Sequence, residues 1–205
     1  IIQSSNATTV MVVSFVNSGL MTLMQATGVI LGANIGTTVT GQLIAFNLSD
    51  IAPLVVIIGV VMVMFCKKQN VKKIGEVILG FGILFMGLRI MGESMEAVKE
   101  SPKILEFLGS LESPFSAILV GFVITAVLQS SSATVGIILL MVSQGLLEFT
   151  ICPFMILGCN IGSCVSALAA SLSGKKDAKR AALIHLLFNV VGSVIMFIIL
   201  LLAQG

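Results

Sequence analysis

Three long stretches of the chain consist almost entirely of apolar residues, and they limit the folds that it can adopt. Residues 51–66, 74–91 and 181–203 each approach the length of about 20 residues that an α-helix needs to cross a bilayer. Their apolar residues are continuous rather than alternating with polar ones, which excludes a transmembrane β-barrel. Charged residues make up 10% of the chain, less than half of the share of about a quarter that soluble domains carry. The sequence therefore predicts an all-α polytopic membrane protein.

A short polar motif occurs twice, each time at the same distance from a second motif. Gln3–Thr8 reads QSSNAT and Gln129–Thr134 reads QSSSAT, an offset of 126 residues. The sequence G-x-N-I-G follows both copies in register, at Gly32–Gly36 and at Gly158–Gly162. Fifteen of the 38 aligned positions that cover both motifs are identical. Generic apolar helices do not share polar motifs in register, so the chain contains an internal repeat.

The apolar stretches on either side of the second QSS motif are too short to cross a bilayer. Residues 115–128 reach about 21 Å as a helix, and residues 134–143 are shorter still. Two short apolar arms joined by a polar tip predict a re-entrant hairpin. Residues 7–17 correspond to the second arm of an equivalent hairpin, and we expect at least one helix to precede Ile1.

Two further segments, residues 21–46 and 147–172, are long enough to span the membrane, but G-x-N-I-G lies near the middle of each. We expect both helices to be broken there. Bare backbone at that depth is tolerated only where it lines a cavity in the protein. Glycine-interrupted segments at matching places in two repeats indicate a transporter binding site.

The distribution of charge predicts how the segments are oriented. Residues 67–73 and 174–180 are basic loops, which the positive-inside rule places in the cytoplasm of a cell-membrane protein. Tracing the spans from these loops, the first hairpin enters from the cytoplasm and the second from outside. The sequence thus predicts two inverted-topology repeats, residues 1–91 with their connecting spans and residues 115–205, joined by an acidic extracytoplasmic connection at 92–114.

The two polar tips carry neutral hydrogen-bonding groups directly before a helix start at Ala7 or Ala133. The free backbone N–H groups and the dipole of a helix N-terminus favour an anion. Side-chain oxygens and unwound carbonyls at the G-x-N-I-G sequences suit a small cation such as Na⁺, and the candidates are Asn34, Thr37, Thr38, Asn160 and Ser163. We therefore expect a mixed anion and cation pocket near the membrane midplane.

Other interpretations of the same residues carry less weight. Serine, threonine and G-x-x-x-G sequences also pack helices together, but two copies in inverted positions favour a binding site. A serine paired with His185 would need a third group to orient the base, and no acidic residue lies deep in any span, so we do not expect an enzyme. His185 is interpreted as a helix-packing residue rather than a proton carrier. The net charge of +2 and the lack of basic blocks argue against a nucleic-acid partner.

With QSS-x-AT and G-x-N-I-G-[TS] both duplicated, the sequence resembles the type II sodium-dependent phosphate cotransporter family and its bacterial relatives, over nearly the whole chain. The resemblance implies symport of inorganic phosphate with Na⁺ as the coupling ion, by alternating access across the cytoplasmic membrane. Family members bind substrate and sodium at the QSSS hairpins. Carried over to this chain, the substrate residues are Ser4, Ser5, Asn6, Ser130, Ser131 and Ser132, and the sodium residues are Gln3, Thr8, Asn34, Thr37, Thr38, Gln129, Thr134, Asn160 and Ser163.

The two half-sites differ in composition. The first copy has Asn6 where the second has Ser132, and the second reads Ser163-Cys164 where the first reads Thr37-Thr38. Sodium-coupled transport of another oxyanion such as sulfate, a phosphate exporter and a channel stay open as alternatives. The expected partners are phosphate, the lipid bilayer, a second copy of the chain in a homodimer and a PhoU-like regulatory domain outside this chain.

Overall fold

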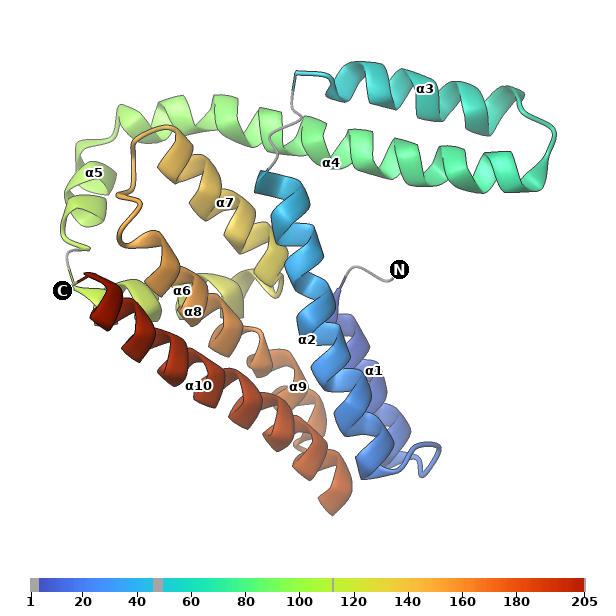
Figure 1. The fold of residues 1–205 in the computed structure, drawn as a ribbon, viewed down its shortest axis with the longest axis vertical. Helices are drawn as coiled ribbons and strands as arrows, with labels where there is room; N and C mark the ends of the chain where they lie inside the picture. Colours follow the sequence, from blue (N-terminus) through green and yellow to red (C-terminus); the bar gives the residue numbers. More distant parts are fainter. Residues whose placement is uncertain (1–3, 46–49, 112, 205) are drawn as a thin grey trace. The chain divides into compact units, whose positions relative to one another are not determined.

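The computed structural model describes residues 4–45, 50–111 and 113–204, and α-helix is the only regular secondary structure in these ranges (Figure 1). The prediction of an all-α chain is thus confirmed. The helices are α1 (Ser5–Asn17), α2 (Leu23–Ala45), α3 (Ala52–Phe65), α4 (Gln69–Lys99), α5 (Pro102–Gly109), α6 (Pro114–Leu128), α7 (Ser131–Ser143), α8 (Cys152–Gly162), α9 (Cys164–Ser171) and α10 (Lys176–Gln204).

Four of the described helical segments are long and apolar enough to cross a membrane: Leu23–Ala45, Gln69–Met95, Cys152–Ser171 and Lys176–Ala203. Many large apolar side chains on α10 are exposed, among them Ile195, Ile198 and Leu202. Such a surface suits contact with lipid rather than with water. The apolar helix predicted at 51–66 is present as α3, but its 14 residues make it shorter than a full span.

The chain forms two compact units, residues 42–105 and residues 1–41 together with 106–205. In the smaller unit, α3 and α4 pack as an antiparallel pair (Figure 1). Glycines allow the two backbones to approach closely. A Cβ atom added to Gly59 would lie 2.6 Å from the Leu79 backbone nitrogen, and one on Gly82 would lie 2.8 Å from that of Val56. Small residues at helix contacts are typical of membrane-embedded pairs.

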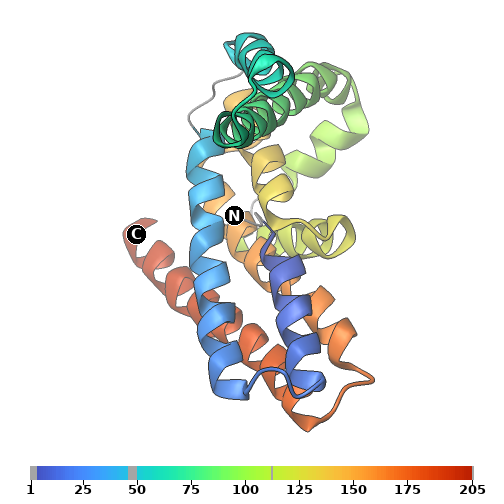
Figure 2. The same ribbon diagram turned by 90° about the vertical axis from the view of Figure 1, so that its right-hand side faces the viewer.

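In the larger unit, α1 and α7 begin side by side and run to opposite ends (Figure 2). At their starts, Asn6 Nδ2 donates a hydrogen bond to the Gln129 carbonyl at 2.9 Å. At the far end of α1, the Lys175 N–H donates to Asn17 Oδ1 at 2.8 Å. Gly145, which follows α7, instead lines a cavity together with Pro114 at the start of α6. The tips of the two predicted hairpins therefore meet between the two ends of this unit.

Two buried clusters hold the larger unit together. One lies between α6, α7 and α8 and includes Ile138, Phe154 and Met155. The other joins α1 and α2 to α9 and α10 through small or branched residues such as Val13 and Ile30. These clusters fix the helices whose polar residues face the meeting point of the tips.

The helix breaks predicted at the two G-x-N-I-G sequences have different outcomes. α2 is continuous from Leu23 to Ala45, so the break predicted within residues 21–46 is wrong. Between α8 and α9, Ser163 interrupts the second segment but keeps helical dihedral angles, φ −62° and ψ −21°. Its N–H still donates to the Cys159 carbonyl at 3.0 Å. A glycine inside a helix costs only about 1 kcal/mol relative to alanine, which the neighbouring helical hydrogen bonds outweigh.

The two basic segments are more helical than predicted. α4 begins at Gln69 and α10 begins at Lys176, so only the first residues of the predicted loops 67–73 and 174–180 lie outside helices. Arg180 pairs with Asp177 in the first turns of α10, at 2.9 Å. The acidic connection is also largely helical, because α4 continues to Lys99 and α5 follows it. An acidic residue in the first turn and periodic apolar residues explain why α10 starts early.

Candidate binding site

The starts of α1 and α7 have the same capping geometry. Ser4 Oγ accepts a hydrogen bond from the Ala7 N–H at 3.2 Å, and Ser130 Oγ accepts from the Ala133 N–H at 3.3 Å. Both capping serines have extended backbones, with φ −138° and ψ 103° at Ser4 and φ −143° and ψ 103° at Ser130. The helices therefore start at Ser5 and Ser131, two residues before the predicted starts at Ala7 and Ala133. The remaining first-turn N–H groups of each helix keep the partial positive charge that favours an anion.

The two tips contact each other through Asn6 and Gln129. Asn6 Nδ2 donates to the Gln129 carbonyl at 2.9 Å and to Ser166 Oγ at 3.1 Å. Ser166 Oγ in turn donates to Gln129 Oε1. Gln129 adopts a left-handed conformation with φ 55°, the one positive φ of a non-glycine residue in the described ranges. Ser166 was missed from the sequence, although its repeat position, 126 residues after Thr40, is polar in both copies.

A cavity of about 50 Å³ lies where the tips meet. All of its lining residues are among those predicted: Ser4, Ser5, Asn6, Thr37, Gln129, Ser130, Ser131 and Ser132. Gln3 lies outside the described residues. Asn6 uses its Nδ2 hydrogens on Gln129 and Ser166, and its Oδ1 is buried without a partner among the described residues.

A second cavity, of about 210 Å³, shares Ser5, Thr37 and Ser131 with the first and therefore adjoins it. α1, α2, α7, α8 and α10 all contribute to its wall. Its lining residues are Ser5, Asn34, Ile35, Thr37, Thr38, Ser131, Asn160, Ser163, Phe188 and Asn189. Phe188 and Asn189 were not predicted. An amide side chain in the mostly apolar span of α10 was the available signal for Asn189.

Several hydroxyl groups at these cavities donate their hydrogens to helix carbonyls. Thr37 donates to the Ala33 carbonyl at 3.0 Å, and Ser163 donates to the Asn160 carbonyl at 2.7 Å. Thr38 donates to the Ile35 carbonyl at 2.6 Å. A hydroxyl that has given away its hydrogen still offers lone pairs, so these oxygens suit a hard cation.

Thr8 and Thr134 line neither cavity. Their hydroxyls donate to the carbonyls of Ser4 at 2.8 Å and Ser130 at 3.0 Å, one turn earlier in the same helices. The structure therefore brings most of the predicted residues to one place and leaves these two threonines in the caps of α1 and α7.

His185 is fully buried in α10, nine residues after the start of the helix. Its Nε2 lies 3.3 Å from Asn34 Oδ1, which links α10 to the first G-x-N-I-G sequence. The His185 carbonyl accepts a hydrogen bond from Asn189 Nδ2 at 2.9 Å. The histidine thus packs between helices, directly behind residues that line the larger polar cavity.

No charged residue lines either polar cavity within the part of the chain that the structure describes. The cavities consist of hydroxyls, amides and the first turns of α1 and α7. Such a neutral site can bind an anion and a cation together, because each ion balances the charge of the other.

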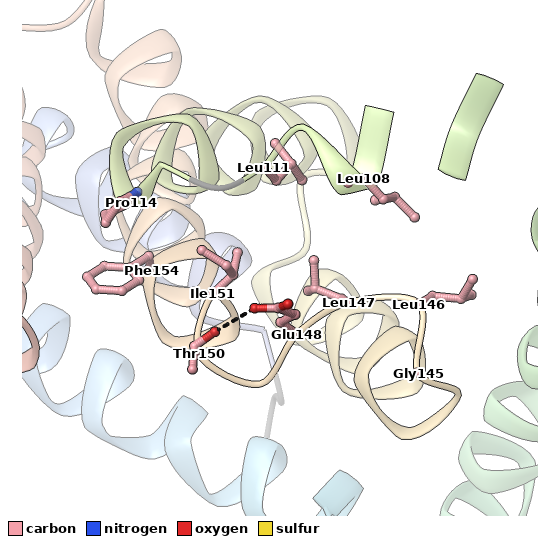
Figure 3. Close-up of a pocket in the computed structure, with 11 residues that line it drawn as sticks. Leu108, Leu111, Pro114, Gly145, Leu146, Leu147, Glu148, Thr150, Ile151 and Phe154 are labelled. Carbon is pink, nitrogen blue, oxygen red and sulfur yellow. Dashed lines mark hydrogen bonds between the residues drawn. The ribbon is translucent and has the colours of Figure 1, made fainter. Parts of the chain in front are cut away.

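A larger cavity, of about 590 Å³, lies at the other end of α6. Figure 3 shows Pro114, Leu111 and Leu108 along one side of it and Phe154, Ile151 and Leu147 along the other. Most of its lining residues are apolar, and four of them are leucines. Glu148 is the one charged residue among the described residues that line it, and it accepts a hydrogen bond from the Thr150 hydroxyl at 3.2 Å. A carboxylate repels oxyanions, so this cavity is a poorer candidate for anion binding than the smaller polar ones.

Long apolar helices around a neutral polar cavity are typical of multi-pass membrane transporters. The sequence profile of the Na⁺/Pi-cotransporter family matches residues 1–93 and 94–202, and the chain belongs to this family. The family consists of transporters rather than enzymes.

Three relatives illustrate the range of the family. YqeW of Bacillus subtilis, an uncharacterized protein, is 34% identical over the whole chain, which spans 67% of its length. The "Putative inorganic phosphate export protein YjbB" of Escherichia coli is 30% identical over 95% of the chain but only 36% of its own length. The rat sodium-dependent phosphate transport protein 2A is 33% identical over 54% of the chain and 19% of its length. No solved structure matches the chain.

Proposed function

We propose that this chain forms the transport pathway of a sodium-coupled symporter of inorganic phosphate, with both ions bound where the two tips meet. The observation that carries the proposal is the hydrogen bond from Asn6 to the Gln129 carbonyl, between residues 123 positions apart. It brings the two QSS motifs to one cavity, whose lining residues come from both sequence repeats.

The first turns of α1 and α7 are the proposed phosphate donors. Each presents backbone N–H groups and serine hydroxyls to the cavity at the tips, through Ser4–Asn6 in one copy and Ser130–Ser132 in the other. Helix N-termini bind phosphate by this combination of N–H groups and dipole. Ser5 and Ser131 also line the cavity of about 210 Å³, so hydroxyl donors face phosphate in either of the two adjoining cavities.

Sodium supplies the charge that the protein lacks. A phosphate ion in these cavities would meet no lysine or arginine among the described lining residues. Burying an unbalanced anion is costly, so a cation that enters with it lowers the cost of binding. The proposed ligands are the hydroxyl oxygens of Thr37, Thr38 and Ser163 with the amide oxygens of Gln129 and Asn160.

The proposed membrane arrangement is a pair of inverted repeats that rock against each other. The opposite directions of α1 and α7 from their common starting point support it. In this arrangement the repeats are residues 1–91 and 115–205, the connection 92–114 is extracytoplasmic, and the basic segments near Lys68 and Lys176 are cytoplasmic. We also propose that two copies of the chain form a homodimer and that a PhoU-like regulatory domain lies outside this chain.

The test is phosphate uptake into proteoliposomes that contain the full-length protein. Radiolabelled phosphate uptake is measured with an inward sodium gradient, with potassium in its place, and with excess unlabelled sulfate. We expect uptake that requires sodium and is unaffected by sulfate. Equal uptake in potassium would rule out sodium coupling.

Two substitutions test the site itself. Gln129→Ala and Ser131→Ala should abolish sodium-dependent uptake, because they remove groups that line the cavity at the tips. Ser143→Ala is the matched control, since Ser143 donates only to the Leu140 carbonyl at the far end of α7. Uptake at the wild-type rate by Gln129→Ala and Ser131→Ala would contradict the assignment of the site.

A phosphate exporter is the second candidate function, favoured by the match to YjbB over 95% of the chain. Vesicles preloaded with labelled phosphate distinguish the two directions. Loss of phosphate from these vesicles without a sodium gradient, together with no sodium-dependent uptake, would favour export.

A further inference from the structure

His185 and Asn34 form a contact between α10 and the first G-x-N-I-G sequence. His185 Nε2 lies 3.3 Å from Asn34 Oδ1, and the histidine side chain is fully buried. The carbonyl of His185 accepts hydrogen bonds from Asn189 Nδ2 at 2.9 Å and from Cys164 Sγ at 3.8 Å. These two bonds hold the backbone of His185, while the contact with Asn34 Oδ1 is the polar contact of its imidazole ring.

The chemistry of the two side chains determines the direction of the hydrogen bond. An amide oxygen can only accept, so the Nε2 of the histidine carries the hydrogen and donates. The Nδ1 of His185 is buried and has no partner among the described residues. This pattern fits a neutral imidazole that serves as a fixed donor to Asn34.

This hydrogen bond uses the Oδ1 of Asn34 and leaves its Nδ2 hydrogens available to another acceptor. Asn34 Nδ2 is buried without a partner in the described structure, and the residue lines the cavity of about 210 Å³. An unpaired buried donor is costly until an acceptor arrives. An N–H group cannot coordinate a cation, whereas it can donate to an oxyanion.

We propose that His185 is a positioning residue that turns the Asn34 amide so that its N–H groups bind the oxyanion substrate. The inference rests on the proposed function and changes one of its assignments, because Asn34 then binds phosphate rather than sodium. Asn160, the equivalent residue of the second repeat, has no histidine contact and keeps its proposed role at sodium.

The test separates phosphate affinity from sodium affinity in the proteoliposome assay. His185→Ala should raise the KM for phosphate about tenfold or more, the usual effect of losing a hydrogen bond to a charged ligand. The sodium concentration for half-maximal uptake should change less than about twofold. His185→Gln should restore most of the phosphate affinity, because the Nε2 of glutamine can take the place of the imidazole Nε2. His185→Asn is the matched control, since its shorter amide cannot reach Asn34.

Asn34→Asp gives an independent test at the other partner. It keeps the acceptor for His185 but replaces the N–H groups with a second anionic oxygen. We expect it to lose phosphate affinity and to keep or gain sodium affinity, because a carboxylate attracts a cation. An unchanged KM for phosphate would overturn the inference, since the variant lacks the N–H groups that are proposed to bind the oxyanion. Wild-type kinetics in His185→Ala, or in His185→Asn if that alanine variant does not fold, would also overturn it.

A binding measurement distinguishes failure of this inference from failure of the proposed function. If the wild-type protein shows no phosphate uptake, the proposed transport function fails. Phosphate should still raise the thermal unfolding midpoint of the wild type and of His185→Gln in detergent, but not that of Asn34→Asp. No phosphate stabilisation of the wild type, or equal stabilisation of Asn34→Asp, would contradict the role of Asn34.

Discussion

The chain carries the same pair of motifs twice, and the two copies agree at their serine caps but differ at their glycines. Ser4 and Ser130 cap α1 and α7 with nearly equal distances and dihedral angles. The turns that follow these helices also match, with φ 76° at Gly19 and φ 70° at Gly145. Local sequence is enough to build these features, because each uses hydrogen bonds within a few residues.

The G-x-N-I-G sequences meet different surroundings. A Cβ atom on Gly158 would lie 2.0 Å from the Ile118 carbonyl oxygen, and one on Gly162 would lie 2.6 Å from that of Phe122. The equivalent atoms on Gly32 and Gly36 would meet nothing within 4 Å. The second pair of glycines therefore allows α8 to pack against α6, while the first pair faces open space in this structure. The same motif serves packing in one copy without doing so in the other.

Alanine at the two equivalent glycines should show the largest difference. Gly158→Ala should destabilise the protein by about 1–3 kcal/mol, because its methyl group overlaps the backbone of α6. Gly32→Ala should leave stability unchanged or raise it slightly, since alanine favours a helix. Thermal unfolding in detergent measures both variants. If Gly32→Ala were as damaging as Gly158→Ala, another helix would have to cover Gly32 in the membrane.

The fourth residue of each QSS motif should show a smaller difference. Asn6 donates to Gln129 and Ser166, whereas Ser132 Oγ is within hydrogen-bond distance of Ser130 Oγ alone among the described residues, at 3.5 Å. Asn6→Ala should therefore cost about 1–2 kcal/mol of stability, and Ser132→Ala a few tenths at most. Asn6→Ser makes the first motif identical to the second and should fall between the two. Equal unfolding midpoints for Asn6→Ala and Ser132→Ala would mean that the contact between the tips contributes little.

The capping serines should show the smallest difference, because their geometry is the same. Ser4→Ala and Ser130→Ala should each lower stability by about 0.5–1 kcal/mol, and the two values should agree within error. Unfolding in detergent again provides the measurement. If one substitution lowered the free energy of unfolding twice as much as the other, the two caps would contribute unequally to stability.

The sequence predicted most of the helices, although not α5, and most of the residues at the cavities, because apolar length and polar repeats are local signals. The helix through 21–46 was predicted to break and does not, because glycine propensity is weak against a continuous run of helical hydrogen bonds. Ser166 and Asn189 had weak signals in the sequence, but their partners depend on how α9 and α10 pack. The contact of Asn34 with His185 spans 151 positions, and no local pattern predicts it.

The equal lengths of α1 and α7 have an electrical consequence. Each helix has 13 residues and extends about 20 Å from the tips, in opposite directions. With the proposed membrane arrangement, an ion bound at the tips lies about midway through the field. Moving one charge across 100 mV corresponds to about 2.3 kcal/mol, so half of that path corresponds to about 1.2 kcal/mol. The apparent affinity for sodium should then change about sevenfold for each 100 mV of membrane potential.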